Sequence, residues 1–273
     1  MKLSEIKLLL AQRGLKLTKS LGQNFLHDQN QLRRILRAAE VGPADKVLEI
    51  GPGLGPLTAL LVEQAGAVLA IEKDRRLFDY LAQRFSTVSN LKLIHADAFQ
   101  YLRENRRWGG WKLAANLPYS VASPLLVELA QAAEPPDRLT ATLQLEVAQR
   151  IAAPAGSEHY GVLGLLLGLR YQSRDWFKIP ASCFFPAPGV DSACVVLARR
   201  TEPLLPPPLH ATFTKLVKRG FSQRRKMMFK LLKQDWPQDA LRRAFAQAGL
   251  APQTRAEDAS LEQFALLAQI VSQ

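Results

Sequence analysis

A glycine-rich turn constrains the fold of this chain more than any other feature. Residues 46–50 have the pattern of a short buried strand, and residues 56–64 have the pattern of a helix. Between them, glycines at positions 51, 53 and 55 allow the backbone to turn sharply and to approach a bound group closely. Because the following helix offers N–H groups at its start, this unit indicates a ligand-binding edge of an α/β sheet.

The alternation of strands and helices continues along the chain. Apolar segments at 68–71, 91–95 and 113–115 predict further strands, and residues 74–85 predict a helix between the first two. Residues 125–133 are expected to be helical, and 141–145 and 193–197 are strand-like. Such alternation is typical of a parallel sheet, with ligands at the carboxyl ends of its strands.

A proline-rich linker at residues 201–208 separates this pattern from a helical one. We expect an α/β domain over residues 1–200 and a small all-helical domain over residues 208–273. A basic amino-terminal arm, which includes Lys16 and Lys19, precedes a helix with Leu32 and Ile35 on its apolar face.

Composition limits the partner and the compartment. The chain has 273 residues, a net charge of +12 and a pI near 10, which favours a polyanionic partner such as nucleic acid. No segment has the roughly 20 apolar residues of a membrane span, and residues 1–14 lack the pattern of a signal peptide. Cys183 and Cys194 are therefore expected to be reduced in a cytoplasmic protein. The four histidines have no metal-like spacing, so no metal is expected.

Two acids follow predicted strands and suit a nucleoside-containing cofactor. Glu72 comes 21 positions after Gly51, where a carboxylate can accept hydrogen bonds from both ribose hydroxyls, and Asp97 can accept from an adenine amino group. A dinucleotide fingerprint would need glycine at position 56, which is Pro56, so the E-x-G-x-G-x-G turn instead indicates S-adenosylmethionine. A solvated acid at Glu72 and a helix N-cap at Asp97 are the structural alternatives.

The segment Asn116-Leu117-Pro118-Tyr119 follows the predicted strand at 113–115. An exocyclic ring amine is a poor nucleophile, but the Asn116 side-chain oxygen and a nearby backbone carbonyl can accept both of its N–H bonds and aim its lone pair. Tyr119 supplies a ring on which a flipped base can stack. The segment therefore predicts methyl transfer to a base nitrogen, helped by positioning and electrostatics, with a simple strand-to-loop turn as the alternative.

These motifs, in this order, resemble the KsgA/RsmA family of small-subunit ribosomal RNA adenine N6,N6-dimethyltransferases. The resemblance runs nearly end to end. It is carried by KSLGQNFL (19–26), LEIGPGLGPLT (48–58), IEKD (71–74), HADAF (95–99), NLPY (116–119), FFPAPGVDSACVVL (184–197), FSQRRKMM (221–228) and RAEDASLEQF (255–264). It implies a Rossmann-like methyltransferase fold with a helical carboxyl-terminal domain.

The resemblance also implies roles for single residues around the cofactor. Asn24 and Leu26 would close over it, Gly51 would approach its methionine part, Glu72 its ribose and Asp97 its adenine.

At the target base, Asn116 and the Leu117 carbonyl would hold N6, and Asn116 would also border the cofactor. Tyr119 would stack on the base, and Phe184 would complete an aromatic clamp, with Phe185 as the alternative. Core packing is the other interpretation of both phenylalanines. The family often has lysine where this chain has Gly189, which removes one expected RNA contact.

Residues 215–233 carry eight basic residues and no acid. They predict a helix that is apolar on one face and basic on the other, and the resemblance places Arg224, Arg225 and Lys226 on 16S ribosomal RNA. Such contacts would be made to phosphates. A solvated basic face and a membrane-surface helix are the alternatives.

The resemblance implies dimethylation of two adjacent adenosines near the 3′ end of 16S ribosomal RNA, with S-adenosylhomocysteine as the other product. We expect the enzyme to be a monomer. Its substrate would be the small ribosomal subunit or an assembly precursor. Two alternatives stay open: a large-subunit dimethyltransferase of the macrolide-resistance type, and an assembly factor that acts mainly by binding. A DNA adenine methyltransferase would share the asparagine-proline segment but would lack KSLGQNFL.

Overall fold

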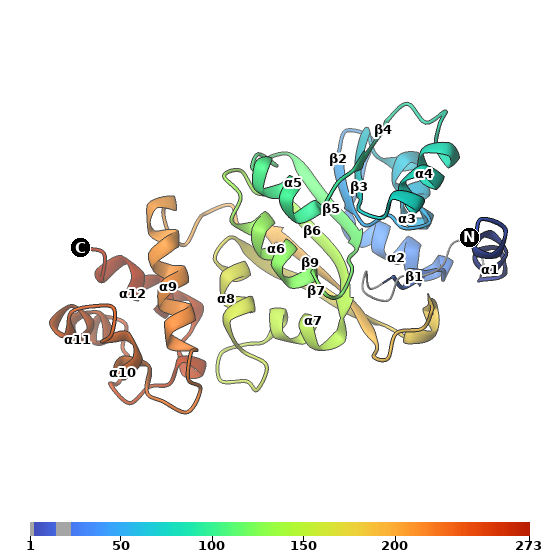
Figure 1. The fold of residues 1–273 in the computed structure, drawn as a ribbon. Helices are drawn as coiled ribbons and strands as arrows, with labels where there is room; N and C mark the ends of the chain where they lie inside the picture. The colour runs from blue at the N-terminus through green and yellow to red at the C-terminus, as the bar shows by residue number, and fades with distance from the viewer. Residues whose placement is uncertain (1–2, 15–22) are drawn as a thin grey trace. The chain divides into compact units, whose positions relative to one another are not determined.

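The computed structural model describes residues 3–14 and 23–273, and its chain divides into two compact units (Figure 1). The first unit comprises Met1–Ala148 and Ser173–Arg199, and the second comprises Gln149–Gln172 and Arg200–Gln273. Lys16 and Lys19 of the predicted basic arm lie outside the described residues.

A seven-stranded sheet in the order β4-β3-β2-β5-β6-β9-β7 organises the first unit (Figure 1). Its strands are β2 (Lys46–Ile50), β3 (Ala67–Glu72), β4 (Leu91–His95), β5 (Trp111–Asn116), β6 (Arg138–Gln144), β7 (Tyr171–Ile179) and β9 (Ser192–Arg199). Strands β4, β3, β2, β5 and β6 are parallel, and β9 runs antiparallel to β6. The predicted parallel α/β sheet is confirmed, and its central strands end at one common edge.

Helices join the parallel strands, as crossover connections require. The connecting helices are α3 (Pro56–Gln64), α4 (Arg75–Arg84), α5 (Ala98–Glu104) and α6 (Ala122–Ala130). Helices α1 (Leu3–Gln12) and α2 (Gln29–Ala39) precede β2, and α7 (Leu145–Ala152) follows β6. Apolar side chains of α2 and α3 pack on the sheet face that carries Val47, Val68 and Ala114. Helices α5 and α6 lie together in front of the sheet in Figure 1. Because both faces are covered, the central strands are largely buried and mostly apolar.

A small antiparallel pair lies apart from the main sheet. Strand β1 (Phe25–Leu26) pairs with β8 (Phe184–Phe185), with Phe25 opposite Phe185 and Leu26 opposite Phe184. A 3-10 turn, η2 (Ala181–Cys183), leads into β8, and the His27 amide donates to the Cys183 carbonyl at 3.0 Å. The segment before α2 is thereby joined to the turn before β9.

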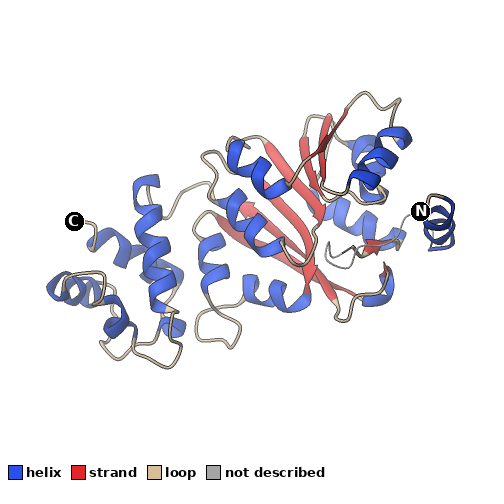
Figure 2. Ribbon diagram, viewed as in Figure 1, coloured by secondary structure: helices blue, strands red, loops and turns tan. Residues whose placement is uncertain are grey.

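The second unit is almost entirely helical (Figure 2). It contains α8 (Val162–Gly168), α9 (His210–Gly220), α10 (Met228–Leu232), α11 (Gln238–Gln247) and α12 (Leu261–Ile270), with 3-10 turns η3 (Pro207–Leu209) and η4 (Ala256–Asp258). The helical pattern predicted from residue 208 onward is confirmed. Helix α12 begins with a capping box in which Ser260 and Gln263 bond reciprocally.

Four sequence-based expectations about the fold differ from the structure. The helix predicted over residues 215–233 is interrupted, because α9 ends at Gly220 and α10 begins only at Met228. The predicted larger domain over 1–200 is interrupted, because residues 149–172 pack with the carboxyl-terminal helices: the Tyr160 hydroxyl donates to the Ala259 carbonyl at 2.9 Å. Strand β6 ends at Gln144, so Leu145 begins α7 instead of ending a strand. Strand β7 was not expected, since its residues 172–176 are all exposed and show no apolar alternation.

Candidate functional site

A cavity of about 420 Å³ opens at the carboxyl ends of the parallel strands. Strands β2, β3 and β5 deliver the glycine turn, Glu72 and Asn116 to this one edge, because parallel neighbours share their direction. Eight of the predicted site residues line the cavity: Asn24, Leu26, Gly51, Glu72, Asp97, Asn116, Leu117 and Tyr119.

The glycine turn can be built only from glycines. Gly51, Gly53 and Gly55 have φ angles of 68°, 63° and 75°, in the left-handed region that other residues rarely adopt. A Cβ atom at Gly53 would lie 2.8 Å from the Phe25 ring, and one at Gly55 would lie 2.7 Å from the Phe85 ring. The turn therefore brings bare backbone to the cavity wall.

Glu72 connects this turn to the end of β3. It is 6% exposed, and its carboxylate accepts the Gly53 amide at 3.1 Å and the Asp74 amide at 2.8 Å. Burial raises the pKa of Glu72, while these two hydrogen bonds oppose the rise. The carboxylate is thus held in one orientation at the cavity wall.

Glu49 is a second buried acid in the cavity wall, and no role was expected for it from the sequence. It is 2% exposed, and its Oε2 has no hydrogen-bond partner among the described residues. Burial, reinforced by the nearby charge of Glu72, raises the pKa of Glu49 to about 8. The signal that could have revealed it is a carboxylate inside an otherwise apolar buried strand. Glu49 therefore holds its proton near pH 7 unless a positive charge close by favours the ionised form.

Asp97 caps α5 as well as lining the cavity. Its Oδ1 accepts the Phe99 amide at 2.8 Å and the Gln100 amide at 3.2 Å, and its Oδ2 pairs with Lys73 at 2.7 Å. The ion pair with Lys73 is the main reason that the pKa of Asp97 is lowered. The helix N-cap considered from the sequence is present, and the carboxylate is ionised at the mouth of the cavity.

Asn116 ends β5 with its side-chain amide oriented by one hydrogen bond. Its Nδ2 donates to the Asn24 carbonyl at 3.0 Å, which leaves Oδ1 buried without a partner among the described residues. The adjacent Leu117 amide donates to the Thr142 carbonyl at 3.1 Å. A buried, unsatisfied acceptor is costly unless a ligand completes it. Oδ1 of Asn116 is therefore placed to accept a hydrogen bond from a ligand.

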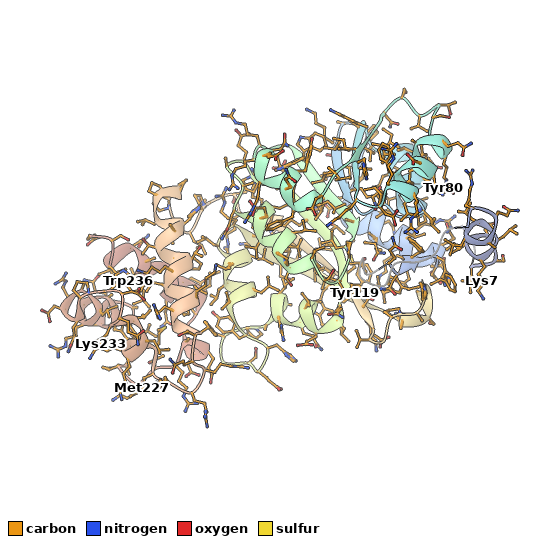
Figure 3. All side chains as sticks on the ribbon, viewed as in Figure 1. Lys7, Tyr80, Tyr119, Met227, Lys233 and Trp236 are labelled. Carbon is orange, nitrogen blue, oxygen red and sulfur yellow. The ribbon has the colours of Figure 1, made fainter. Side chains whose placement is uncertain are left out.

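Tyr119, labelled in Figure 3, follows three residues after Asn116 in the loop that leads to α6. Its hydroxyl lies 2.5 Å from Oγ of Ser192, the first residue of β9. Burial raises the pKa of Tyr119, so the phenol stays neutral near pH 7. The ring forms part of the cavity wall near Asn116.

The structure does not bring Phe184 to the cavity. Phe184 is 2% exposed and packs in the core beside Leu26 and Cys183. Phe185 is half-buried in a neighbouring cluster with Phe25, and Lys7 Nζ lies 5.5 Å from the centre of its ring. Neither phenylalanine is among the residues that line the cavity in the described part of the chain. The pairing of β1 with β8 accounts for both positions.

Arg224, Arg225 and Lys226 lie exposed in the second unit, in the connection from α9 to α10. The Arg224 guanidinium donates to the Glu158 carbonyl at 3.0 Å and lies 3.8 Å from Glu257. Within the described residues, Arg225 and Lys226 have no ion-pair partner.

The basic segment 215–233 is partly neutralised by the acid that follows it. Asp235 pairs with Lys215 at 2.9 Å and also with Arg219. The basic surface that remains unpaired is therefore smaller than the sequence suggested.

Residues 3–14 and 23–273 contain neither a membrane span nor a metal cluster. None of their helices is long and apolar enough to cross a membrane, and none of their His, Cys, Asp and Glu side chains form a group of three that could hold a metal ion. Cys183 and Cys194 are both buried and unpaired.

Comparisons with solved structures relate the fold to RNA methyltransferases. The crystal structure of the 23S rRNA methyltransferase ErmE superposes with a TM-score of 0.69 and 26% identity, covering 92% of this chain and 100% of ErmE. A dimethyladenosine transferase from Plasmodium falciparum has a TM-score of 0.71 at 23% identity, covering 89% and 95% of the two chains, which supports the fold alone.

Sequence comparisons cover nearly the whole chain. The ribosomal RNA small subunit methyltransferase A of Magnetococcus marinus is 42% identical over 266 residues, which are 96% of this chain and 95% of the relative. The protein of the same name from Geobacter sulfurreducens is 38% identical over 261 residues, 93% of this chain and 95% of the relative. The model of the ribosomal RNA adenine dimethylase family matches residues 14–273. This chain is a member of the ribosomal RNA adenine dimethylase family.

Proposed function

We propose that this chain transfers methyl groups from S-adenosylmethionine to N6 of two adjacent adenosines in the 3′-terminal hairpin of 16S ribosomal RNA, during biogenesis of the small subunit. The product would be N6,N6-dimethyladenosine. Family membership and the names of the two relatives support the reaction and the choice of subunit. The buried, unpartnered Oδ1 of Asn116 is the observation that carries the chemistry.

The cavity residues fit S-adenosylmethionine, which supplies a methyl group on a positively charged sulfonium. Glu49 and Glu72 place two buried carboxyl groups at the cavity, where a cation would favour their ionised forms and compensate the cost of burying them. Gly51 offers the close backbone approach that a methionine part requires, since its φ is 68° and it has no side chain. Glu72 and Asp97 would accept hydrogen bonds from the ribose and the adenine. Asn24 and Leu26 would close the cavity from the amino-terminal side.

Asn116 would act on the target amine. Its Nδ2 is already committed to the Asn24 carbonyl, so its Oδ1 is the atom that accepts a hydrogen bond from N6. The Leu117 carbonyl would accept the second N–H bond. With both protons held by acceptors, the nitrogen lone pair is turned out of conjugation and toward the methyl group. Tyr119 would hold the base by stacking. Phe184 can complete a clamp only if it leaves the core position seen here.

The exposed Arg225 and Lys226, together with Arg224, would bind the backbone of 16S ribosomal RNA in a monomeric enzyme. Phosphate contacts position a structured RNA, while a splayed-out base is read at the cavity. The substrate would be the small subunit or its assembly precursor.

Labelled S-adenosylmethionine tests this proposal directly. The protein is incubated with unmethylated small subunits, and with large subunits and DNA in parallel, and nucleosides are analysed by mass spectrometry. Dimethyladenosine only in the small subunit is expected. Label in the large subunit would instead indicate a 23S rRNA methyltransferase, as ErmE is. Particle binding without label would indicate an assembly factor.

A further inference from the structure

Ser192 touches a cavity residue without reaching the cavity itself. Its side chain is fully buried at the start of β9, and its Oγ lies 2.5 Å from the Tyr119 hydroxyl. Tyr119 lines the cavity, whereas Ser192 is not among the lining residues in the described part of the chain. Ser192 therefore acts on anything bound there only through Tyr119.

The loop that carries Tyr119 has few other attachments. Residues 117–121 connect β5 to α6 without regular structure. Their backbone bonds run from the Leu117 amide to the Thr142 carbonyl and from the Val121 amide to the Pro118 carbonyl, both at 3.1 Å, and the Val121 carbonyl accepts the Leu125 amide at 3.0 Å. None of these bonds uses an atom of Tyr119. The contact with Ser192 is thus the bond that ties the Tyr119 side chain to the sheet.

Ser192 is itself held firmly by its neighbour Asp191. The Asp191 carboxylate accepts the Ala181 amide at 2.9 Å and pairs with Lys178 at 2.7 Å, and its carbonyl accepts the Leu145 amide at 3.0 Å. These bonds reach η2, β7 and the start of α7. Ser192 also stands opposite Gln144 in the β6–β9 register. A serine whose strand and whose neighbour are both held in place is a rigid reference point for a side chain on a loop.

We propose that Ser192, held in place by Asp191, is a positioning residue that sets the orientation of the Tyr119 ring against the target base. This inference rests on the proposed function, because it explains how the base would be aligned with Asn116. A ring that loses its hydroxyl bond leaves a buried polar group unpaired and gains freedom to tilt. Since small misplacements of a reacting group reduce rates strongly, the loss is expected in the chemical step.

A double-mutant cycle tests the proposal with intact small subunits as substrate. Ser192→Ala and Tyr119→Phe remove the same bond from opposite sides while keeping the ring. Each is expected to lower kcat about tenfold, with KM for subunits and the Kd for S-adenosylmethionine changed less than about twofold. The double variant should lose no more than the worse single variant. The proposal would be overturned if the kcat losses of the two single variants multiplied in the double variant. It would also be overturned if Ser192→Ala kept wild-type kcat.

The matched control is Thr140→Val, which removes a buried hydroxyl from β6 that does not contact Tyr119. It should keep wild-type kcat. If Ser192→Ala fails to fold, Tyr119→Phe alone still decides, because an unchanged kcat there would show that the bond is not needed.

A second measurement does not depend on activity. The protein is labelled with fluorotyrosine, and the Tyr119 resonance is assigned from its absence in Tyr119→Phe. Ser192→Ala is expected to shift or broaden that resonance, whereas Thr140→Val leaves it unchanged. An unaffected resonance in Ser192→Ala would contradict the proposal. If the resonance responds but the wild-type protein methylates no RNA, the proposed function fails while the orienting contact stands.

Discussion

Two parts of the cavity wall are held by different kinds of interaction. At the glycine turn, backbone carries the structure: Gly53 and Asp74 donate their amides to Glu72, and left-handed glycines leave no side chain in the way. At the end of β5 and in the loop after it, Asn116 and Tyr119 each depend on one side-chain hydrogen bond, to the Asn24 carbonyl and to Ser192. We expect the glycine turn to be set before ligands arrive, and the Asn116–Tyr119 segment to be sensitive to single substitutions.

The largest effect on kcat is expected from a substitution at Asn116. Asn116→Ala removes the free acceptor, and kcat should fall on the order of 10³-fold, since a single preorganised hydrogen-bonding group can carry that much of the barrier. Binding of the variant to small subunits should persist. Methylation at the wild-type rate would rule out the role of the amide. Single-turnover rates and a pull-down with ribosomal particles provide the two measurements.

Glu72→Ala tests the contribution of Glu72, beside the glycine turn, to cofactor binding. The substitution removes the acceptor for two backbone amides and for the expected ribose hydroxyls, so the Kd for S-adenosylmethionine should rise about 100-fold. Isothermal titration calorimetry gives this value directly. Asp79→Ala is a suitable control, since Asp79 is an exposed acid on α4 that pairs with Arg75. Unchanged affinity in Glu72→Ala would refute the assignment.

Gly53→Ala tests whether the bare backbone of the glycine turn is needed for cofactor binding. The new Cβ would meet the Phe25 ring at 2.8 Å in a backbone conformation unsuited to alanine, and Phe25 itself lines the cavity. We expect cofactor affinity to fall about tenfold. Gly110→Ala has φ of 76° but open space around it, so it should lower stability slightly without weakening the cofactor. If both variants lost the same affinity for S-adenosylmethionine, backbone strain, and not the new contact with Phe25, would explain the loss.

Glu49 predicts a pH dependence of stability. Burial raises its folded-state pKa to about 8 from an ordinary value of 4.5, so between these values the folded chain holds a proton that the unfolded chain has released. Stability should therefore fall as pH rises through this window. Urea denaturation from pH 5.5 to 8.5 should show that Glu49→Gln loses roughly 1–3 kcal/mol less than wild type across it. If the free energy of unfolding changed with pH to the same extent in both proteins, the raised pKa of Glu49 would be contradicted.

The smallest effect is expected in the second unit. Replacing Arg225 and Lys226 by Ala should weaken binding to small subunits and reduce the salt slope of log K by about one to two. Lys215→Ala is the control, because Lys215 already pairs with Asp235 and should change the slope less. Filter binding at several salt concentrations measures both. An unaltered slope in the double variant would indicate a merely solvated basic face.

Local sequence patterns predicted the central sheet because each strand there is an apolar run with a clear end. Residues 46–50 and 56–64 match β2 and α3 residue for residue, since glycine and proline mark their limits. Strand β7 could not be predicted in this way, because its place depends on pairing at the sheet edge and not on its own composition. Residues 149–172 belong to the second unit because of contacts between residues far apart in the sequence, such as Tyr160 with Ala259. Local sequence patterns do not reveal such contacts.

The site shows the same division between local and long-range information. The order of Gly51, Glu72, Asp97 and Asn116 predicted which residues share a cavity, because each follows a parallel strand. The burial of Phe184 follows from its pairing with Leu26, which no local pattern specifies. The bond from Tyr119 to Ser192 joins residues 73 positions apart and could be found only in the folded chain.

The most direct test of the central claim is a methyl count on one RNA fragment. Unmethylated small subunits are reacted to completion with labelled S-adenosylmethionine, and the 3′-terminal fragment of 16S ribosomal RNA is isolated and analysed by tandem mass spectrometry. We expect four labelled methyl groups, two on each of two adjacent adenosines. Label on any other nucleotide, or an unlabelled fragment from subunits that bind the protein, would contradict it.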